Sequence, residues 1–430
     1  MPNPTGKNQY TRCPAPDDPE FMTALVAYHL AGVTNAEILS CILLKDHDME
    51  VSARTIYRRR SELGLCGSGR TTASLPTTVI RQLVLDQLKL DPLSRKGPNT
   101  IREAIRNATG LYLTRDVVRQ EMLLHDSDGF KLRAPGSKKV HRTPLLALGP
   151  HHEWSADGHD KLTSIGFPIW GIRDKWSGQW QGLWVLPNNR LKESTAYLYL
   201  SLIYALGGTV NGMPLQSSTD CGTETILIFA LANALREAFA NPDDDDLGPA
   251  HRFMRSIHNI TVERGWHRLR IQWGDNIKTM YEAGVDRYNA ADPDQHELHQ
   301  WLWPKLIQSE LDSLRYQFNN HKTRFDRHKI LPSNVSPNVA VALCEQWGGE
   351  NCLQPVDRAV IREMMQVIGD NSVRFVTPEF AARAEAVYAF LGCPELTPAT
   401  AWSVFWKMLP LTRSEMYSTY NIDDVYNLLN

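Results

Sequence analysis

Three acidic residues carry the chemistry that the sequence indicates most directly: Asp157, Asp220 and Glu263. They lie in the motifs Trp-Ser-Ala-Asp-Gly, Ser-Thr-Asp-Cys-Gly-Thr-Glu and Ile-Thr-Val-Glu-Arg, respectively. Carboxylate oxygens suit Mg²⁺ and Mn²⁺, and a cluster of them can hold two ions that activate a phosphate ester for in-line attack. The chain has 48 acidic residues, so three acids mean little unless their surroundings bring them together.

Runs of β-branched and aromatic residues predict a sheet in the middle of the chain. Strands are expected over residues 153–156, 166–172, 181–186 and 214–219. Helices are expected from about Leu191 to Leu206, from Thr223 to Ala240 and from Ser256 to about Trp273. Three strands, a helix, another strand and further helices indicate an α/β sheet domain.

On this map the three acids fall where strand ends and a helix can meet. Asp157 ends the first strand, Asp220 follows the fourth, and Glu263 lies on the last helix, so all three can converge on one sheet edge. Asn259 and His267 lie four residues before and after Glu263. They share its helix face and are expected to orient the substrate or the metal ligands.

Length and composition favour an ordinary globular protein of two or three domains, with 430 residues, 42% hydrophobic and 22% charged. The net charge is −2, yet residues 51–150 hold 18 Lys/Arg against 8 Asp/Glu, the sign that a phosphate-facing region needs. Seven scattered cysteines predict reduced thiols inside the cell. The longest apolar stretches, 195–206 and 226–235, are too short to span a bilayer, so no membrane partner is expected.

The N-terminal part of the chain reads as helical. Residues 51–60 form a Ser-capped basic helix after a turn, which is the outline of a helix-turn-helix reader of DNA. Three of its arginines are expected to contact phosphates or a groove: Arg58, Arg59 and Arg60. The alternative is a solvated helix end that happens to carry several arginines.

A second unit of the same kind follows a linker expected at residues 67–74. It contains an amphipathic helix at 98–106 and a Thr-capped helix at 113–122, whose outer face carries Arg115 and Arg119. Both arginines are expected to contact DNA.

A series of short motifs runs through residues 149–324 in a fixed order. The motifs are Gly-Pro-His-His-Glu-Trp at 149–154, Asp-Gly at 157–158, Asn-Asn-Arg at 188–190, Asp-Cys-Gly-Thr-Glu at 220–224, Arg-Ser-Ile-His-Asn at 255–259, Val-Glu-Arg at 262–264 and Phe-Asn-Asn-His at 318–321. Together they resemble the eukaryotic integrase core-domain proteins, relatives of retroviral integrases and transposases.

The resemblance implies an α/β RNase H-like core, a mixed sheet flanked by helices, with Asp157, Asp220 and Glu263 as a DDE triad holding two Mg²⁺ or Mn²⁺ ions. The implied reaction is DNA integration: cleavage near an element's end, then attack of the freed 3′-hydroxyl on target DNA. The implied partners are the element ends and target DNA. A homo-oligomer when active and a nuclear location are implied as well.

The expected domain order is a polar tail at 1–19, tandem helix-turn-helix units at 20–130, a basic linker at 131–150, the integrase core at 151–325 and a mainly helical region at 326–430. Several features depart from the family pattern: the retroviral N-terminal zinc module has no counterpart, no strand-rich C-terminal barrel is evident, and two departures lie near the third acid. Asp220 and Glu263 are 43 positions apart, and an acidic loop at 243–246 is expected to absorb the extra length. Gly265 lies inside the third-acid helix, where glycine costs about 1 kcal/mol relative to alanine, so it is expected to loosen that turn.

A second reading belongs to a different class: a domesticated, catalytically inactive DNA-binding protein that retains the integrase core fold. A carboxylate-pair glycosidase is set aside, because the tryptophans at 170, 176, 180 and 184 lie in or beside strand runs and are expected in the core. Cys221 has no positioned His–carboxylate partner in the sequence pattern and is expected to be a small packing residue rather than a nucleophile.

Overall fold

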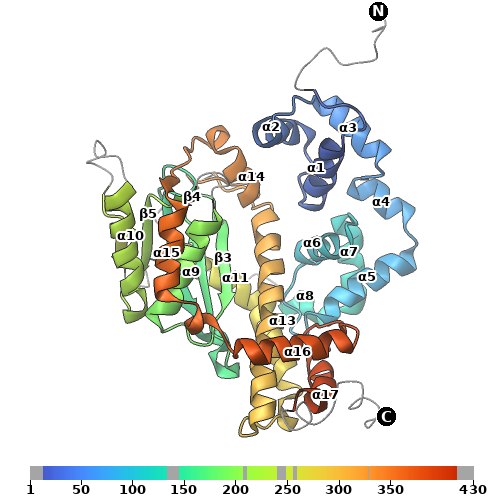
Figure 1. The fold of residues 1–430 in the computed structure, drawn as a ribbon. Helices are drawn as coiled ribbons and strands as arrows, with labels where there is room; N and C mark the ends of the chain where they lie inside the picture. The colour runs from blue at the N-terminus through green and yellow to red at the C-terminus, as the bar shows by residue number, and fades with distance from the viewer. Residues whose placement is uncertain are drawn as a thin grey trace, which may run out of the picture. The chain divides into compact units, whose positions relative to one another are not determined.

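The computed structural model of the 430-residue chain describes residues 13–132, 145–206, 211–239, 248–254, 259–327 and 329–413. The chain divides into two compact units (Figure 1). The first comprises Met1–Pro150 with Gln317–Asn351, and the second comprises His151–Tyr316 with Cys352–Asn430. Residues 317–351 thus group with the helical N-terminal part, whereas the expected domain order divides them between the core and the C-terminal region.

The first unit is helical in its N-terminal part, as expected. Its helices are α1 (Pro19–Leu30), α2 (Ala36–His47), α3 (Ala53–Glu62), α4 (Ser68–Ser74), α5 (Thr77–Lys89), α6 (Pro98–Thr109), α7 (Arg115–His125), α8 (Ser127–Leu132) and α14 (Pro337–Ala342). Side chains cap the N-termini of several of these helices. Asp18 caps α1 by accepting from the N–H of Glu20 at 2.9 Å, and Asn35 caps α2 by accepting from the N–H of Glu37 at 2.8 Å. The stretch expected as a linker, 67–74, is helical from Ser68 and forms α4.

Buried apolar side chains on most of its helices hold this unit together. Buried Leu25, Leu43 and Ile56 come from α1, α2 and α3, respectively. A separate cluster joins α5, α6 and α7 through Val84, Ile105, Val118 and their neighbours. The helical character is therefore confirmed, and the helix-turn-helix assignment stays a prediction.

The second unit contains a mixed five-stranded sheet in order β3-β2-β1-β5-β6 (Figure 1). Its strands are β1 (Glu153–His159), β2 (Ile169–Asp174), β3 (Trp180–Val185), β5 (Gln216–Asp220) and β6 (His251–Met254). β1 and β2 pair antiparallel, as do β2 and β3, whereas β1, β5 and β6 run parallel. The α/β class is confirmed, but β6 is a strand that the sequence pattern did not predict. A separate two-stranded ladder joins β4 (Asn211–Met213) to β7 (Gln354–Val356).

Successive side chains of β1 point to opposite faces of the sheet, and the two faces have different surroundings. Trp154 and Ala156 of β1 belong to the main core, which includes residues of α9 (Lys192–Ala205), α10 (Ile226–Phe239) and α15 (Arg358–Ile368). Ser155 and Asp157 point to the opposite face because strand side chains alternate. There α11 (Ile260–Leu269) packs on β1 and β2. The acids and the main core therefore lie on different faces of the sheet.

The edge strand β3 is covered by α13 (Pro293–Asn320). Gln308 of α13 donates to the carbonyl of Leu183 at 3.0 Å and accepts from the N–H of Val185 at 3.1 Å. These bonds satisfy backbone groups that an open edge would expose. The remaining helices of this unit are α12 (Asp275–Glu282), α16 (Pro378–Phe390) and α17 (Ala401–Thr412), and the described C-terminal part is mainly helical, as expected. Among the described residues no helix combines the length and apolar character needed to cross a membrane.

Candidate active site

The strand register places two of the three acids side by side. In the parallel ladder of β1 and β5, Ser155 pairs with Ser218. Two residues further along each strand come Asp157 and Asp220, so both acids follow the same register and side-chain direction. Asp220 is the last residue of β5, whereas Asp157 lies two residues before the end of β1, so the expectation that Asp157 ends the first strand is wrong. Both acids lie toward the carboxyl ends of adjacent parallel strands.

The third acid comes from α11, which begins at Ile260. The expected helix start at Ser256 lies outside the described residues, as does the acidic loop at 243–246. Glu263 is exposed one turn into α11, and its N–H donates to the carbonyl of Asn259 at 3.2 Å. All three acids line one cleft of about 810 Å³, together with Gly158, Asp160, Asn189, Arg190, Cys221, Gly222, Thr223, Glu224 and Met254.

The carboxylates lie close enough to shift one another's protonation. Burial raises the pKa of Asp157 to about 7, and repulsion from Asp220 and Glu263 adds to the effect. The pKa of Glu263 is also raised, first by burial and then by Asp220, while the charge of Lys161 opposes the change. A cation placed among the three carboxylates would relieve this repulsion.

Asn259 connects the elements that carry the acids, in agreement with its expected role beside the triad. Its amide donates to Asp220 Oδ1 at 3.4 Å and to the carbonyl of Ala156 at 3.3 Å. Its own oxygen accepts from the hydroxyl of Ser155. β1, β5 and the start of α11 are therefore joined through one buried amide. His267 is exposed on α11 and does not line the cleft, so nothing in the geometry supports its expected role.

Trp266 holds Asp157 directly, a role that the sequence motif did not reveal. Its indole Nε1 donates to Asp157 Oδ2 at 3.1 Å. The ring stacks on His159 with centroids 4.9 Å apart and packs against Trp180 at 4.8 Å. Helical spacing in the sequence could have indicated that Trp266 faces the sheet, because Val262, Trp266 and Leu269 form the buried face of α11.

Two glycines make room for these rings. A Cβ on Gly265 would lie 2.3 Å from Trp180 Cζ2, and one on Gly171 would lie 2.5 Å from Trp266 Cη2. The helix does not break at Gly265, since α11 continues through it to Leu269. The expected loosening of that turn stays a prediction. Gly265 permits the close packing of α11 on β3.

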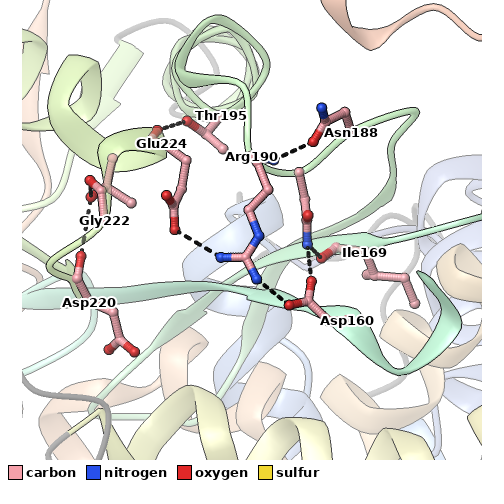
Figure 2. A network of polar contacts seen from close by, with 10 residues as sticks. Asp160, Ile169, Asn188, Arg190, Thr195, Asp220, Gly222 and Glu224 are labelled. Atoms are coloured by element: carbon pink, nitrogen blue, oxygen red, sulfur yellow. Dashed lines mark hydrogen bonds and ion pairs between the residues drawn. The ribbon is translucent and has the colours of Figure 1, made fainter. Parts of the chain in front are cut away.

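A charged network lies among the residues that line the cleft (Figure 2). The guanidinium of Arg190 pairs with Asp160 and lies 3.6 Å from Glu224 Oε1. The buried amide of Asn189 donates to Asp160 Oδ1 at 2.9 Å, and Thr195 donates to the carbonyl of Glu224. Arg190 therefore spans two carboxylates that the sequence pattern did not single out.

The other expectations near the cleft have mixed outcomes. Trp170, Trp176 and Trp180 are buried, as expected of core residues, and Trp184 is half-buried. Cys221 is exposed at the cleft, so its expected role as a packing residue is wrong.

The chemistry of the donor set fits a hard divalent ion, because the three acids offer only oxygen ligands. The side chains as they stand do not form a closed ligand set: among the described residues, no group of three or more His, Cys, Asp and Glu could hold a metal ion. Asp157 Oδ2 is engaged by Trp266 at 3.1 Å. Metal binding therefore requires side-chain adjustment around Asp157, Asp220 and Glu263.

The expected DNA-contacting arginines lie in the first unit and differ in exposure. Arg58 is exposed, Arg59 is half-buried and pairs with Glu62, and both Arg115 and Arg119 are exposed on α7. Arg60 is only 6% exposed, and its guanidinium donates to two backbone carbonyls, those of Val33 and Thr34. Its expected role in DNA contact is therefore corrected to a structural one. Helical spacing signals this, since Arg60 lies four residues after the buried Ile56.

No protein-family model matches the chain, and no curated protein matches it either. The family resemblance therefore depends on the quoted motifs, and the function depends on the geometry and electrostatics of the cleft.

Proposed function

We propose that the chain is a transposon-derived integrase that cleaves DNA and transfers the strand with a DDE triad of Asp157, Asp220 and Glu263. The observation that carries this proposal is the meeting of all three acids in one cleft, where burial, with added repulsion from Asp220 and Glu263, raises the pKa of Asp157 to about 7. The mixed sheet with helices on both faces is the architecture that an RNase H-like core requires.

In this proposal the triad holds two Mg²⁺ or Mn²⁺ ions, which would activate the attacking oxygen and neutralise charge on the phosphate. Asp157 must lose its proton before it can bind a cation, so its raised pKa makes metal binding favour neutral and alkaline pH. Asn259 orients Asp220, and the indole of Trp266 orients Asp157. Both side chains restrict the carboxylates, and in this proposal Asp157 exchanges part of its contact with Trp266 for the metal.

The helical first unit is proposed to bind the element ends through tandem helix-turn-helix units. Arg58, Arg59, Arg115 and Arg119 remain its candidate phosphate contacts. Two copies of the chain would bring two ends together, so the active form is proposed to be a homo-oligomer acting on nuclear DNA.

The deciding experiment is Mn²⁺-dependent nicking and joining of supercoiled DNA by the full chain, compared with the Glu263→Gln variant. Glu263 is exposed, so the substitution is expected to leave the fold intact. We expect activity in the wild type and its loss in the variant. Equal background in both, with DNA binding retained, would contradict the proposal.

A second candidate is a domesticated DNA-binding protein that keeps the integrase core without catalysis. The observation that favours it is the lack of a ready ligand set among the described residues, together with the bond from Trp266 to Asp157. Calorimetric titration with Mn²⁺ separates the two candidates. The integrase requires that Asp157→Asn weaken Mn²⁺ binding, whereas unchanged binding supports the inactive protein.

A further inference from the structure

The cleft carries far more negative than positive charge. Five carboxylates line it: Asp157, Asp160, Asp220, Glu224 and Glu263. Among the described lining residues, Arg190 is the one Lys or Arg. A phosphodiester that approaches this cleft meets strong repulsion, and Arg190 is the positive group in its lining that could offset it.

The backbone of Arg190 is fixed while its side chain is free to change partners. The N–H of Arg190 donates to Asn188 Oδ1 at 2.8 Å, and the neighbouring Asn189 is 4% exposed and donates to the carbonyl of Ile169 at 3.4 Å. Gly158 lets this loop approach the acid strand, since a Cβ there would lie 2.7 Å from Asn189 Nδ2. The loop is therefore held next to Asp157.

The guanidinium of Arg190 contacts two carboxylates. Its side chain is 62% exposed and that of its partner Asp160 is 46% exposed. An exposed ion pair adds little to stability, so giving up Asp160 costs little. The side chain of Glu224 is 16% exposed, and its contact with Arg190 is a loose one at 3.6 Å. A guanidinium also matches the geometry of two phosphate oxygens, which it can bind with parallel hydrogen bonds.

We infer that Arg190 is a strand-positioning residue: it leaves Asp160 and Glu224 when DNA enters and binds a backbone phosphate beside the acids. This inference rests on the proposed function, because it takes DNA as the substrate of the cleft. Asp160 then competes with the phosphate and holds Arg190 in place when no DNA is bound.

The test measures binding of a fluorescent DNA duplex by the full chain in EDTA, over a series of salt concentrations. Arg190→Ala is expected to weaken binding about tenfold, the loss of one charge-assisted hydrogen-bonded contact. The slope of log K against log salt should become shallower by about 0.9, the value for one lost phosphate contact. Arg190→Lys should restore most of the slope, because it keeps the charge. Lys192→Ala is the matched control: it removes an exposed positive charge two residues away that does not line the cleft.

A double-mutant cycle makes the test specific. Asp160→Asn should strengthen DNA binding in the wild type by releasing Arg190, and should give a clearly smaller gain in the Arg190→Ala background. Equal gains in both backgrounds would show general charge removal and would overturn the inference. An unchanged salt slope for Arg190→Ala would overturn it as well.

These readouts need neither metal nor turnover, so the two proposals can fail separately. A chain that loses a phosphate contact with Arg190→Ala but never nicks DNA supports this inference and contradicts the integrase. A chain that nicks DNA with an unchanged salt slope in Arg190→Ala retains the integrase function and refutes the role of Arg190.

Discussion

Replacing Asp157 with asparagine should stabilise the protein at alkaline pH when no metal is present. The carboxyl of Asp157 is half-buried, faces two other acids, and has its pKa raised from 3.8 to about 7. Asparagine keeps the shape and an oxygen for the indole of Trp266, yet it carries no charge. Both the desolvation of the charge and the repulsion then disappear.

The sign and size follow from proton linkage. Below pH 3.8 the carboxyl is protonated in the folded and unfolded chain alike, so it has no effect. Between 3.8 and about 7 it ionises in the unfolded chain only, so the free energy of unfolding falls as pH rises, and above about 7 the loss is constant. Each pKa unit corresponds to about 1.4 kcal/mol, so Asp157→Asn should gain at most about 4 kcal/mol at pH 8.

Urea unfolding followed by tryptophan fluorescence measures this effect in the relevant unit. Eleven of the twelve tryptophans lie in His151–Tyr316 and Cys352–Asn430, so the signal reports the unit that carries the acids. Wild type and variant are compared in EDTA from pH 4 to 8, in roughly half-unit steps. Adding Mn²⁺ should then stabilise the wild type and leave the variant nearly unchanged, because a ligand stabilises only the state that binds it.

The reasoning fails if the variant is no more stable than the wild type at pH 8, or if the difference does not shrink toward pH 4. Either outcome would mean that the charge of Asp157 is well solvated or is balanced by a nearby positive group. A higher free energy of unfolding for Asp157→Asn in EDTA, with no effect of Mn²⁺ on the wild type, would confirm the charge repulsion at Asp157 and support the inactive DNA-binding protein.

Two further predictions concern packing and the arginines. Gly265→Ala should destabilise the second unit by about 1–3 kcal/mol in the same urea assay, because its Cβ would lie 2.3 Å from Trp180 Cζ2. Alanine's better helix propensity is too small to offset this clash. The control Gly274→Ala should be tolerated, because the nearest atom to its Cβ lies 3.9 Å away. Arg60→Ala should destabilise the first unit by about 2–4 kcal/mol in circular-dichroism melts, because it leaves the buried carbonyl of Val33 unpaired and removes the bond to Thr34. Arg58→Ala should keep stability and make the salt slope of DNA binding shallower by about one. A stable Arg60→Ala chain with weakened DNA binding would reverse this assignment.

The strands and helices around the acids could be predicted from periodicity, because each has a local signature. The pairing of Asp157 with Asp220 could not, since their shared position depends on the parallel register of β1 and β5. β6 escaped prediction because it has only four residues, and two of them are exposed at the sheet edge. The charged pairs of Arg190 join residues about 30 positions apart, so spacing along the chain gives no sign of them.

Burial, more than residue type, decides what each arginine does. Arg58 and Arg60 are two residues apart on α3, yet the first faces solvent and the second donates hydrogen bonds to backbone carbonyls within the first unit. Arg190 has both features. Its backbone N–H is hydrogen-bonded to Asn188, as in a structural residue, and its exposed guanidinium can exchange partners. A charge-rich motif therefore predicts a binding surface only after the helix period has separated the inward arginines from the outward ones. By exposure Arg190, which lies outside any periodic pattern and is 62% exposed, is a stronger candidate for phosphate contact than Arg60, which is 6% exposed.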